Sequence, residues 1–178
     1  LYAMQTVKAL EIPLKKRVRL LLGTDEECGS GDLEHYYSKE EEAPASVSPD
    51  ADFPIINLEK GGLRGAMTAS YPEDKTLPRI IELSGGTKLN VVPDKAFGRI
   101  EGMEKGALEE ACRKAADETG AVFTVSEEGA LLRVDVKGRG AHASTPGEGI
   151  NAVTALMKLA VSLPLADSEG LRKLKAVE

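Results

Sequence analysis

The chain has few of the residue types on which many binding and catalytic sites depend. Its 178 residues include no tryptophan, only 4% aromatic residues, two cysteines and two histidines. A core must therefore be built mainly from Leu, Val, Ile and Ala. The two cysteines, Cys28 and Cys112, do not form a disulfide framework. A reducing, cytoplasmic environment is therefore expected.

Basic charge and long apolar runs are also scarce. Asp and Glu number 29 against 23 Lys and Arg, which gives a formal net charge of −6. Binding to nucleic acid requires a basic surface that neutralises phosphates, so no nucleic-acid partner is expected. The chain has no apolar stretch of the ~18 residues that a membrane helix needs, so no membrane span or membrane partner is expected. The length suits one globular domain or two small ones.

The N-terminal part contains an acidic turn at the end of an apolar segment. Its pattern predicts a helix over residues 1–14 and a strand over 17–22, the latter suited to a mostly parallel sheet covered on both faces. The following turn carries Glu26 and Glu27. In open α/β sheets ligands bind at the carboxyl ends of strands, and two carboxylates can divide metal ligation from proton transfer. A solvated turn explains the same pair, so both interpretations stay open here.

A change of composition follows this part. Residues 32–41 have the pattern of a helix and 53–58 that of a short strand, whereas 59–78 are rich in glycine, proline and charge. Such a segment is typical of a crossing between domains. The sequence therefore predicts two domains, 1–58 and 59–178.

The second part predicts an α+β sandwich. Strands are expected at 79–83, 96–100, 122–125 and 130–137, the last with Leu132, Val134 and Val136 facing inward. An amphipathic helix is expected over 107–119, with Gly120 as its stop. Antiparallel strands with helices on one face form this class of fold.

A further helix is expected after the second histidine. Thr145-Pro146-Gly147-Glu148 has the form of a capping box with proline at the first helical position. This pattern predicts a helix that continues through Leu163. Its apolar stripe is expected to consist of Ile150, Val153, Met157 and Ala160.

Three motifs in this order carry a family resemblance. They are Gly23-Thr24-Asp25-Glu26-Glu27-Cys28-Gly29-Ser30-Gly31-Asp32, Ser48-Pro49-Asp50-Ala51-Asp52-Phe53-Pro54 and Gly140-Ala141-His142-Ala143-Ser144-Thr145-Pro146. Together they resemble the zinc amidohydrolase family of bacterial dipeptidase V, carnosinase, aminoacylase and succinyl-diaminopimelate desuccinylase. The wording of the first two motifs is most like the dipeptidase V-like branch. The resemblance covers about residues 1–163.

The resemblance implies a fold and an activity. Residues 1–58 would be part of an α/β, zinc peptidase-like catalytic domain, and 59–178 part of an α+β lid domain. The activity would be hydrolysis of a dipeptide amide bond near a free carboxylate, with two divalent metals. Zinc is the expected metal, and manganese or cobalt are alternatives because carboxylate-rich sites accept several metals. The lid domain would also support a homodimer.

The resemblance also assigns roles to acidic residues of the first part. Glu26 would be the general base that takes a proton from metal-bound water, and Glu27 would be a zinc ligand. Asp50 matches the family's ligand to the second metal. Asp52 is its competitor, and either aspartate could instead cap a strand that begins at Phe53.

Two residues of the second part are implied in substrate binding. His142 would donate a hydrogen bond to the oxyanion of the tetrahedral intermediate, a task that suits an imidazole. It would act either in its own active site or in that of a partner. Asn90 matches a lid asparagine that helps to hold the substrate. An asparagine that turns the chain before Pro93 explains this residue equally well.

Several parts of the family's site are not in this sequence. An upstream His-x-Asp motif, a late histidine ligand and an arginine that grips the substrate carboxylate are missing. A catalytic zinc normally takes three protein ligands, which Glu27 and Asp50 do not supply. The chain is therefore expected to be an internal fragment that is inactive alone. The alternatives are an aminoacylase or desuccinylase acting on N-acyl amino acids, and a non-catalytic lid or dimerisation module.

Overall fold

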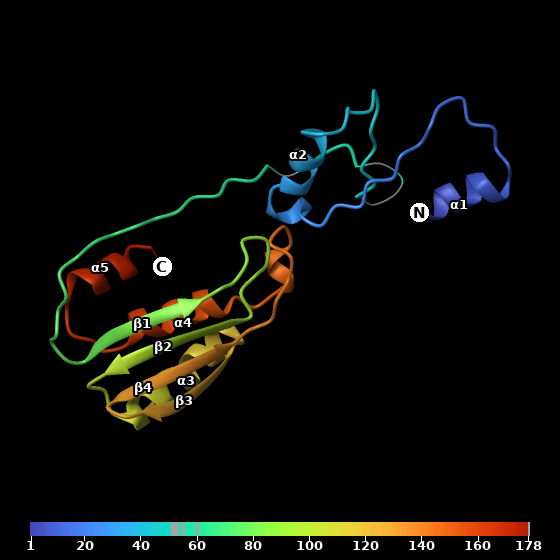
Figure 1. The fold of residues 1–178 in the computed structure, drawn as a ribbon. Helices are drawn as coiled ribbons and strands as arrows, with labels where there is room; N and C mark the ends of the chain where they lie inside the picture. The colour runs from blue at the N-terminus through green and yellow to red at the C-terminus, as the bar shows by residue number, and fades with distance from the viewer. Residues whose placement is uncertain (51–53, 55, 60, 178) are drawn as a thin grey trace. The chain divides into compact units, whose positions relative to one another are not determined.

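The structure is a computed structural model that describes residues 1–50, 54, 56–59 and 61–177. The chain divides into two compact units, Leu1–Gly62 and Leu63–Glu178 (Figure 1). Each unit is described by itself. Among the described residues, no helix combines the length and the apolar character that crossing a membrane would require.

The first unit contains short helical elements and no core among its described residues. Its elements are α1 (Tyr2–Ala9), the 3₁₀ helix η1 (Glu26–Cys28) and α2 (Gly31–Tyr37). None of the residues described in this unit is buried. The two helices confirm the expected positions of helical structure, although both are shorter than the sequence pattern indicated.

The prediction of a strand at residues 17–22 is wrong. These residues have no regular secondary structure, and Val18, Leu20 and Leu22 are exposed. A strand is stable only when neighbouring strands satisfy its backbone groups, and the described residues of this unit contain no strand. The expected strand at 53–58 lies partly outside the described residues, and 56–58 are not in a strand. A mostly parallel sheet in the first unit is therefore not shown.

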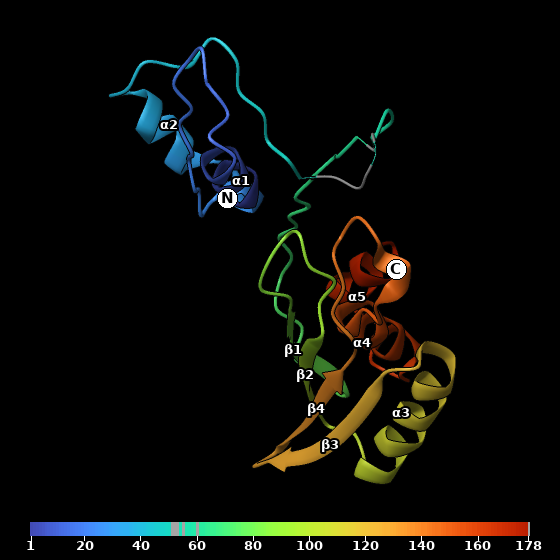
Figure 2. The same cartoon turned by 90° about the vertical axis from the view of Figure 1, so that its right-hand side faces the viewer.

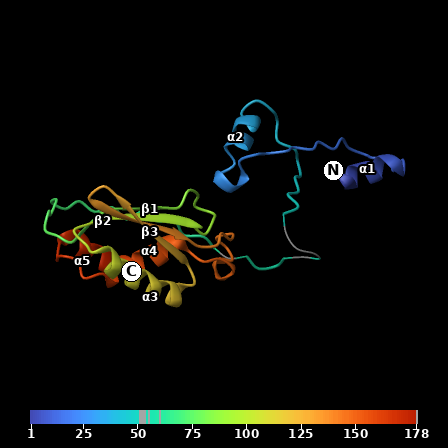
Figure 3. The same ribbon diagram turned by 90° about the horizontal axis from the view of Figure 1, so that it is seen from below.

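The second unit is an α+β layer structure, as expected. Its four-stranded antiparallel sheet has the order β1-β2-β4-β3. The strands are β1 (Arg79–Gly85), β2 (Lys95–Glu101), β3 (Val122–Glu128) and β4 (Leu131–Lys137). The helices are α3 (Lys105–Thr119), α4 (Ala152–Ser162), α5 (Glu169–Lys175) and the 3₁₀ helix η2 (Pro146–Glu148). Figures 2 and 3 show α3 and α4 on the same face of the sheet.

The core lies between that face and the two helices. Leu108 of α3, Leu159 of α4 and Val134 of β4 are its largest fully buried side chains. The inward alternation of β4 is confirmed, since Leu132 and Val136 are buried with Val134. Burial also raises the pKa of the Cys112 thiol to about 11, so this cysteine is a packing residue.

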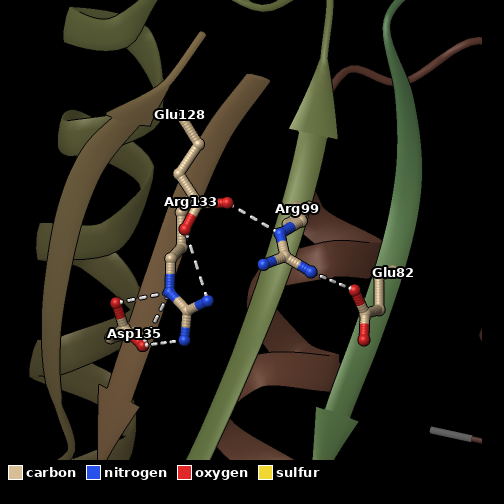
Figure 4. A network of polar contacts seen from close by, with 5 residues as sticks. All are labelled: Glu82, Arg99, Glu128, Arg133 and Asp135. Carbon is tan, nitrogen blue, oxygen red and sulfur yellow. Dashed lines mark hydrogen bonds and ion pairs between the residues drawn. The ribbon is translucent and has the colours of Figure 1, made fainter. Parts of the chain in front are cut away.

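The other face of the sheet carries charge. Figure 4 shows two arginines of neighbouring strands that share the Glu128 carboxylate. Arg99 Nε lies 2.8 Å and Arg133 Nη1 3.4 Å from its oxygens, while Arg99 also pairs with Glu82 and Arg133 with Asp135. The hydrogen bond from Arg99 holds the pKa of Glu128 below its usual value. The arginines are half-buried and their acidic partners largely exposed, and ion pairs that face solvent contribute little stability each. The stability of the unit therefore rests mainly on the helix-covered face.

The helix expected to begin at Pro146 begins later. Pro146 starts only the short η2, and α4 begins at Ala152 because Ile150 pairs with Arg139 in an antiparallel bridge. The paired backbone of Ile150 is extended and cannot be helical. The buried face of α4 consists of Ala152, Ala155, Leu156, Leu159 and Ala160, so Ala160 alone of the expected stripe is fully buried.

Asn151, not Thr145, caps this helix. Its side-chain oxygen accepts hydrogen bonds from the backbone N–H groups of Val153 and Thr154, at 3.0 and 3.1 Å. We expect Asn151→Ala to lower the free energy of unfolding by about 1 kcal/mol. Thr145→Ala should change it by less than about 0.5 kcal/mol, as is usual for exposed positions. Urea unfolding followed by circular dichroism measures both, and equal losses would contradict this assignment of the cap.

Candidate functional site

The second unit brings two of the predicted site residues together at one end of its sheet. Beyond the last β2–β4 pair, the chain that precedes β2 and the chain that follows β4 continue side by side. Gly138 N donates to Asp94 O at 2.8 Å, and Val92 N donates to Ala141 O at 2.8 Å. The two loops therefore extend the strand pairing past the sheet.

Asn90 and His142 lie at the end of this extension. Val91 and His142 form an isolated antiparallel bridge, and Ala143 N donates to Asn90 O at 2.9 Å. The side chain of Asn90 is half-buried, and that of His142 is exposed. Residues 52 positions apart in the sequence are thus neighbours in space, which no periodic pattern in the sequence indicates.

The loop that carries His142 depends on close backbone contacts. Arg139 N and Ile150 N each donate to the other residue's carbonyl oxygen, at 2.9 and 2.8 Å, which closes the loop at its base. The Arg139 side chain also donates from Nε to Glu148 O at 2.9 Å. The backbone of Gly138 packs closely against that of Ile150, since a Cβ at Gly138 would lie 2.0 Å from Ile150 O. A fixed loop base holds His142 at the end of the sheet.

Two atoms of Ser144, its hydroxyl oxygen and its backbone nitrogen, contact the Nδ1 atom of the His142 ring. His142 Nδ1 lies 2.7 Å from Ser144 Oγ and accepts a hydrogen bond from Ser144 N at 3.3 Å. Thr145 N donates to His142 O at 3.0 Å, so the backbone turns tightly after the histidine. Sequence reasoning did not identify Ser144, although its spacing of two residues from His142 permits this local contact.

The acidic turn of the first unit holds its two glutamates on a closed loop. Glu26 and Glu27 lie in η1, and both are exposed. Asp25 Oδ2 accepts from Gly31 N at 2.9 Å, and Asp32 Oδ2 accepts from Thr24 N at 2.6 Å. The bond from Thr24 is the main reason why the pKa of Asp32 is lowered. The neighbouring aspartates thus close the turn, a role that sequence reasoning missed and that aspartate beside glycine commonly takes.

Asp50 is placed in the same unit and is exposed. Its backbone N–H donates to Ser48 O at 3.1 Å. Its competitor, Asp52, lies outside the described residues. The described parts of the chain contain no group of three or more His, Cys, Asp or Glu side chains that could hold a metal ion. Because a catalytic zinc takes three protein ligands, Glu27 and Asp50 do not by themselves fit a catalytic metal.

The antiparallel sheet, its one-sided helices and the loop bearing His142 define the class of domain. Residues 129–171, from the turn before β4 into α5, match the family model described as a peptidase dimerisation domain. This match includes His142, Ser144 and the loop closure.

Whole-chain comparisons agree with this match. The chain is 34% identical over 169 residues to "Putative dipeptidase YtjP" of Bacillus subtilis (strain 168), which covers 94% of this chain and 36% of that protein. It is 34% identical over 102 residues to "Putative dipeptidase SH1171" of Staphylococcus haemolyticus (strain JCSC1435), covering 56% of this chain and 22% of that protein. "Putative dipeptidase SAUSA300_1697" of Staphylococcus aureus (strain USA300) is 32% identical over the same length and shares.

The match to the peptidase dimerisation domain and the similarity to putative dipeptidases over 94% of the chain are consistent with part of an M20 peptidase. The resemblance carried by the three sequence motifs is thereby confirmed. The chain spans about a third of the length of the Bacillus relative and less than a quarter of that of the staphylococcal relatives.

Proposed function

We propose that this chain carries part of the machinery of a metal-dependent dipeptidase that hydrolyses the amide bond of a dipeptide. The observation that supports this most directly is the placement of His142 beside Asn90 by paired loops, inside the segment that matches the peptidase family model. The names of the relatives favour a dipeptide over other amide substrates.

The roles proposed for the side chains follow from their chemistry. Glu26, an exposed carboxylate on a closed turn, would accept a proton from the attacking water. His142 would donate a hydrogen bond to the oxyanion of the tetrahedral intermediate. Asn90, fixed to the same pair of loops, would hold the substrate with His142.

We propose Glu27 and Asp50 as this chain's contribution to a divalent metal site, with zinc as the first choice and manganese or cobalt as alternatives. Further ligands are needed to complete such a site, so no step of the reaction is assigned to a metal here. We also propose that residues 1–58 belong to the catalytic domain and 59–178 to the lid, and that the lid supports a homodimer, as the description of the matched domain suggests.

The test uses a chimera in which this chain replaces the matching 169-residue segment of the Bacillus relative. The panel contains dipeptides, including β-Ala-His, together with N-acetyl and N-succinyl amino acids. We expect turnover of dipeptides, loss of turnover in EDTA, and recovery when zinc or manganese is restored.

The unaltered relative is the positive control for the same panel. Preference for N-acyl amino acids would replace the dipeptidase assignment by an aminoacylase or desuccinylase. A folded chimera without turnover, beside an active relative, would favour a non-catalytic lid or dimerisation module and contradict the proposal.

A further inference from the structure

The structure assigns Ser144 as the positioning residue of His142: it holds the neutral imidazole in the tautomer that carries its proton on Nε2. This inference rests on the proposed function only for its consequence in catalysis. The tautomer itself follows from hydrogen bonds within the second unit.

The direction of the hydrogen bonds decides the tautomer. A backbone N–H can only donate, so the contact from Ser144 N makes His142 Nδ1 an acceptor. Ser144 Oγ, at 2.7 Å from the same nitrogen, must then donate its hydroxyl proton. A neutral imidazole carries one proton on its two nitrogens, and that proton is therefore on Nε2.

The local backbone keeps Ser144 in place for this role. The bridge between Val91 and His142 fixes the strand-like end of the loop, and Thr145 N donates to His142 O in the following turn. Ser144 lies within this turn. Its side chain is exposed, so its hydroxyl is not required by the packing of the core.

The chemistry of an oxyanion explains why this tautomer matters. A developing negative charge is stabilised by a hydrogen-bond donor that already points at it. With Nδ1 occupied by Ser144, the imidazole presents Nε2–H as its donor. The opposite tautomer would present a lone pair to the oxyanion, which is repulsive. Ser144 would thus act through His142 without touching the substrate.

Nitrogen NMR of the histidine side chains tests the assignment on the 178-residue chain itself. The chain has two histidines, so a His35→Gln background leaves only the signals of His142. At a pH where the imidazole is neutral, we expect Nε2 at the protonated, pyrrole-type shift and Nδ1 at the pyridine-type limit. Ser144→Ala removes the 2.7 Å hydroxyl contact and keeps the longer, 3.3 Å contact from the backbone N–H of residue 144. Both shifts should therefore move part of the way toward the average of two exchanging tautomers, and Ser144→Thr should restore them.

Two spectroscopic results would overturn the inference. One is a protonated Nδ1 in the unsubstituted chain. The other is an identical pair of shifts in the unsubstituted chain and in Ser144→Ala. Because this readout does not need activity, a chimera without dipeptidase activity would refute the proposed function and leave the tautomer assignment to be judged by NMR alone.

Kinetics of the chimera test the consequence. We expect Ser144→Ala to lower kcat about 10-fold with KM unchanged, a part of the roughly 100-fold or greater loss that removal of an oxyanion donor causes. Ser144→Thr should recover most of this loss. An unchanged kcat in Ser144→Ala, in a chimera that is active, would refute the positioning role.

Discussion

Glu26→Gln in the chimera is expected to lower kcat for dipeptide hydrolysis by at least about 100-fold, the low end of what a positioned general base contributes. The amide of glutamine has nearly the shape of the carboxylate but cannot accept the proton of the attacking water. Since Glu26 is exposed and on a turn closed by other residues, its substitution should leave the fold unchanged. Steady-state kinetics and circular dichroism of the same preparation measure the two quantities.

Glu27→Gln separates the two adjacent glutamates. If Glu27 contributes to a metal site, its substitution should weaken metal binding, and activity should return at higher zinc or manganese concentration. Glu26→Gln should keep its metal content and stay inactive at any metal concentration. Glu34→Gln, at an exposed glutamate of α2, is the matched control and should change neither quantity. If Glu26→Gln were rescued by added metal and Glu27→Gln were not, the assignment of base and ligand would be reversed.

Gly138→Ala is expected to disrupt the loop that carries His142. The added methyl group would lie 2.0 Å from Ile150 O, which is a backbone atom that cannot move without opening the closure between Arg139 and Ile150. Overpacking of this kind costs about 1–3 kcal/mol. Urea unfolding of the 178-residue chain measures the loss, and limited proteolysis reports whether the loop has opened.

Gly147→Ala is the matched control in the same loop. A Cβ at Gly147 meets nothing within 4 Å, and the residue lies in η2. Replacing a glycine where alanine fits without strain stabilises a protein by about 0.4–1 kcal/mol, so the two glycines should respond with opposite sign. Equal effects of the two substitutions would show that the closure at Gly138 is not what fixes the loop.

The elements of the second unit could be predicted because their signals are local. The alternation of β4 and the apolar stripe of α3 each arise from one segment packing on one side. Gly120 ends α3 with a φ of 71°, a left-handed conformation that glycine adopts without strain. These features depend on residues that are close in the sequence, so they can be predicted without knowledge of the rest of the fold.

The errors arose where a distant segment decides the local structure. Thr145 to Glu148 has a good capping pattern, but the pairing of Ile150 with Arg139 delays α4 to Ala152. The apolar run at 17–22 has strand propensity, but the described residues of its unit offer no neighbouring strand. In both places the local propensity for helix or strand is overridden by tertiary context, namely whether another segment pairs with the backbone.

The sequence names candidate residues for the site but does not predict their geometry. The family resemblance points to Glu26, Glu27, Asp50, Asn90 and His142 as candidates, while the adjacency of Asn90 and His142 required the structure. The contact of Ser144 with the imidazole needed it as well, because sequence spacing alone does not fix where a side chain points.

The rate of β-Ala-His hydrolysis by the chimera, measured with and without Glu26→Gln, tests the central claim most directly. The account predicts turnover that depends on added metal and falls by at least about 100-fold in the variant. Turnover that survives Glu26→Gln, or a folded chimera that is inactive beside an active relative, would contradict the claim that this chain supplies working parts of a dipeptidase.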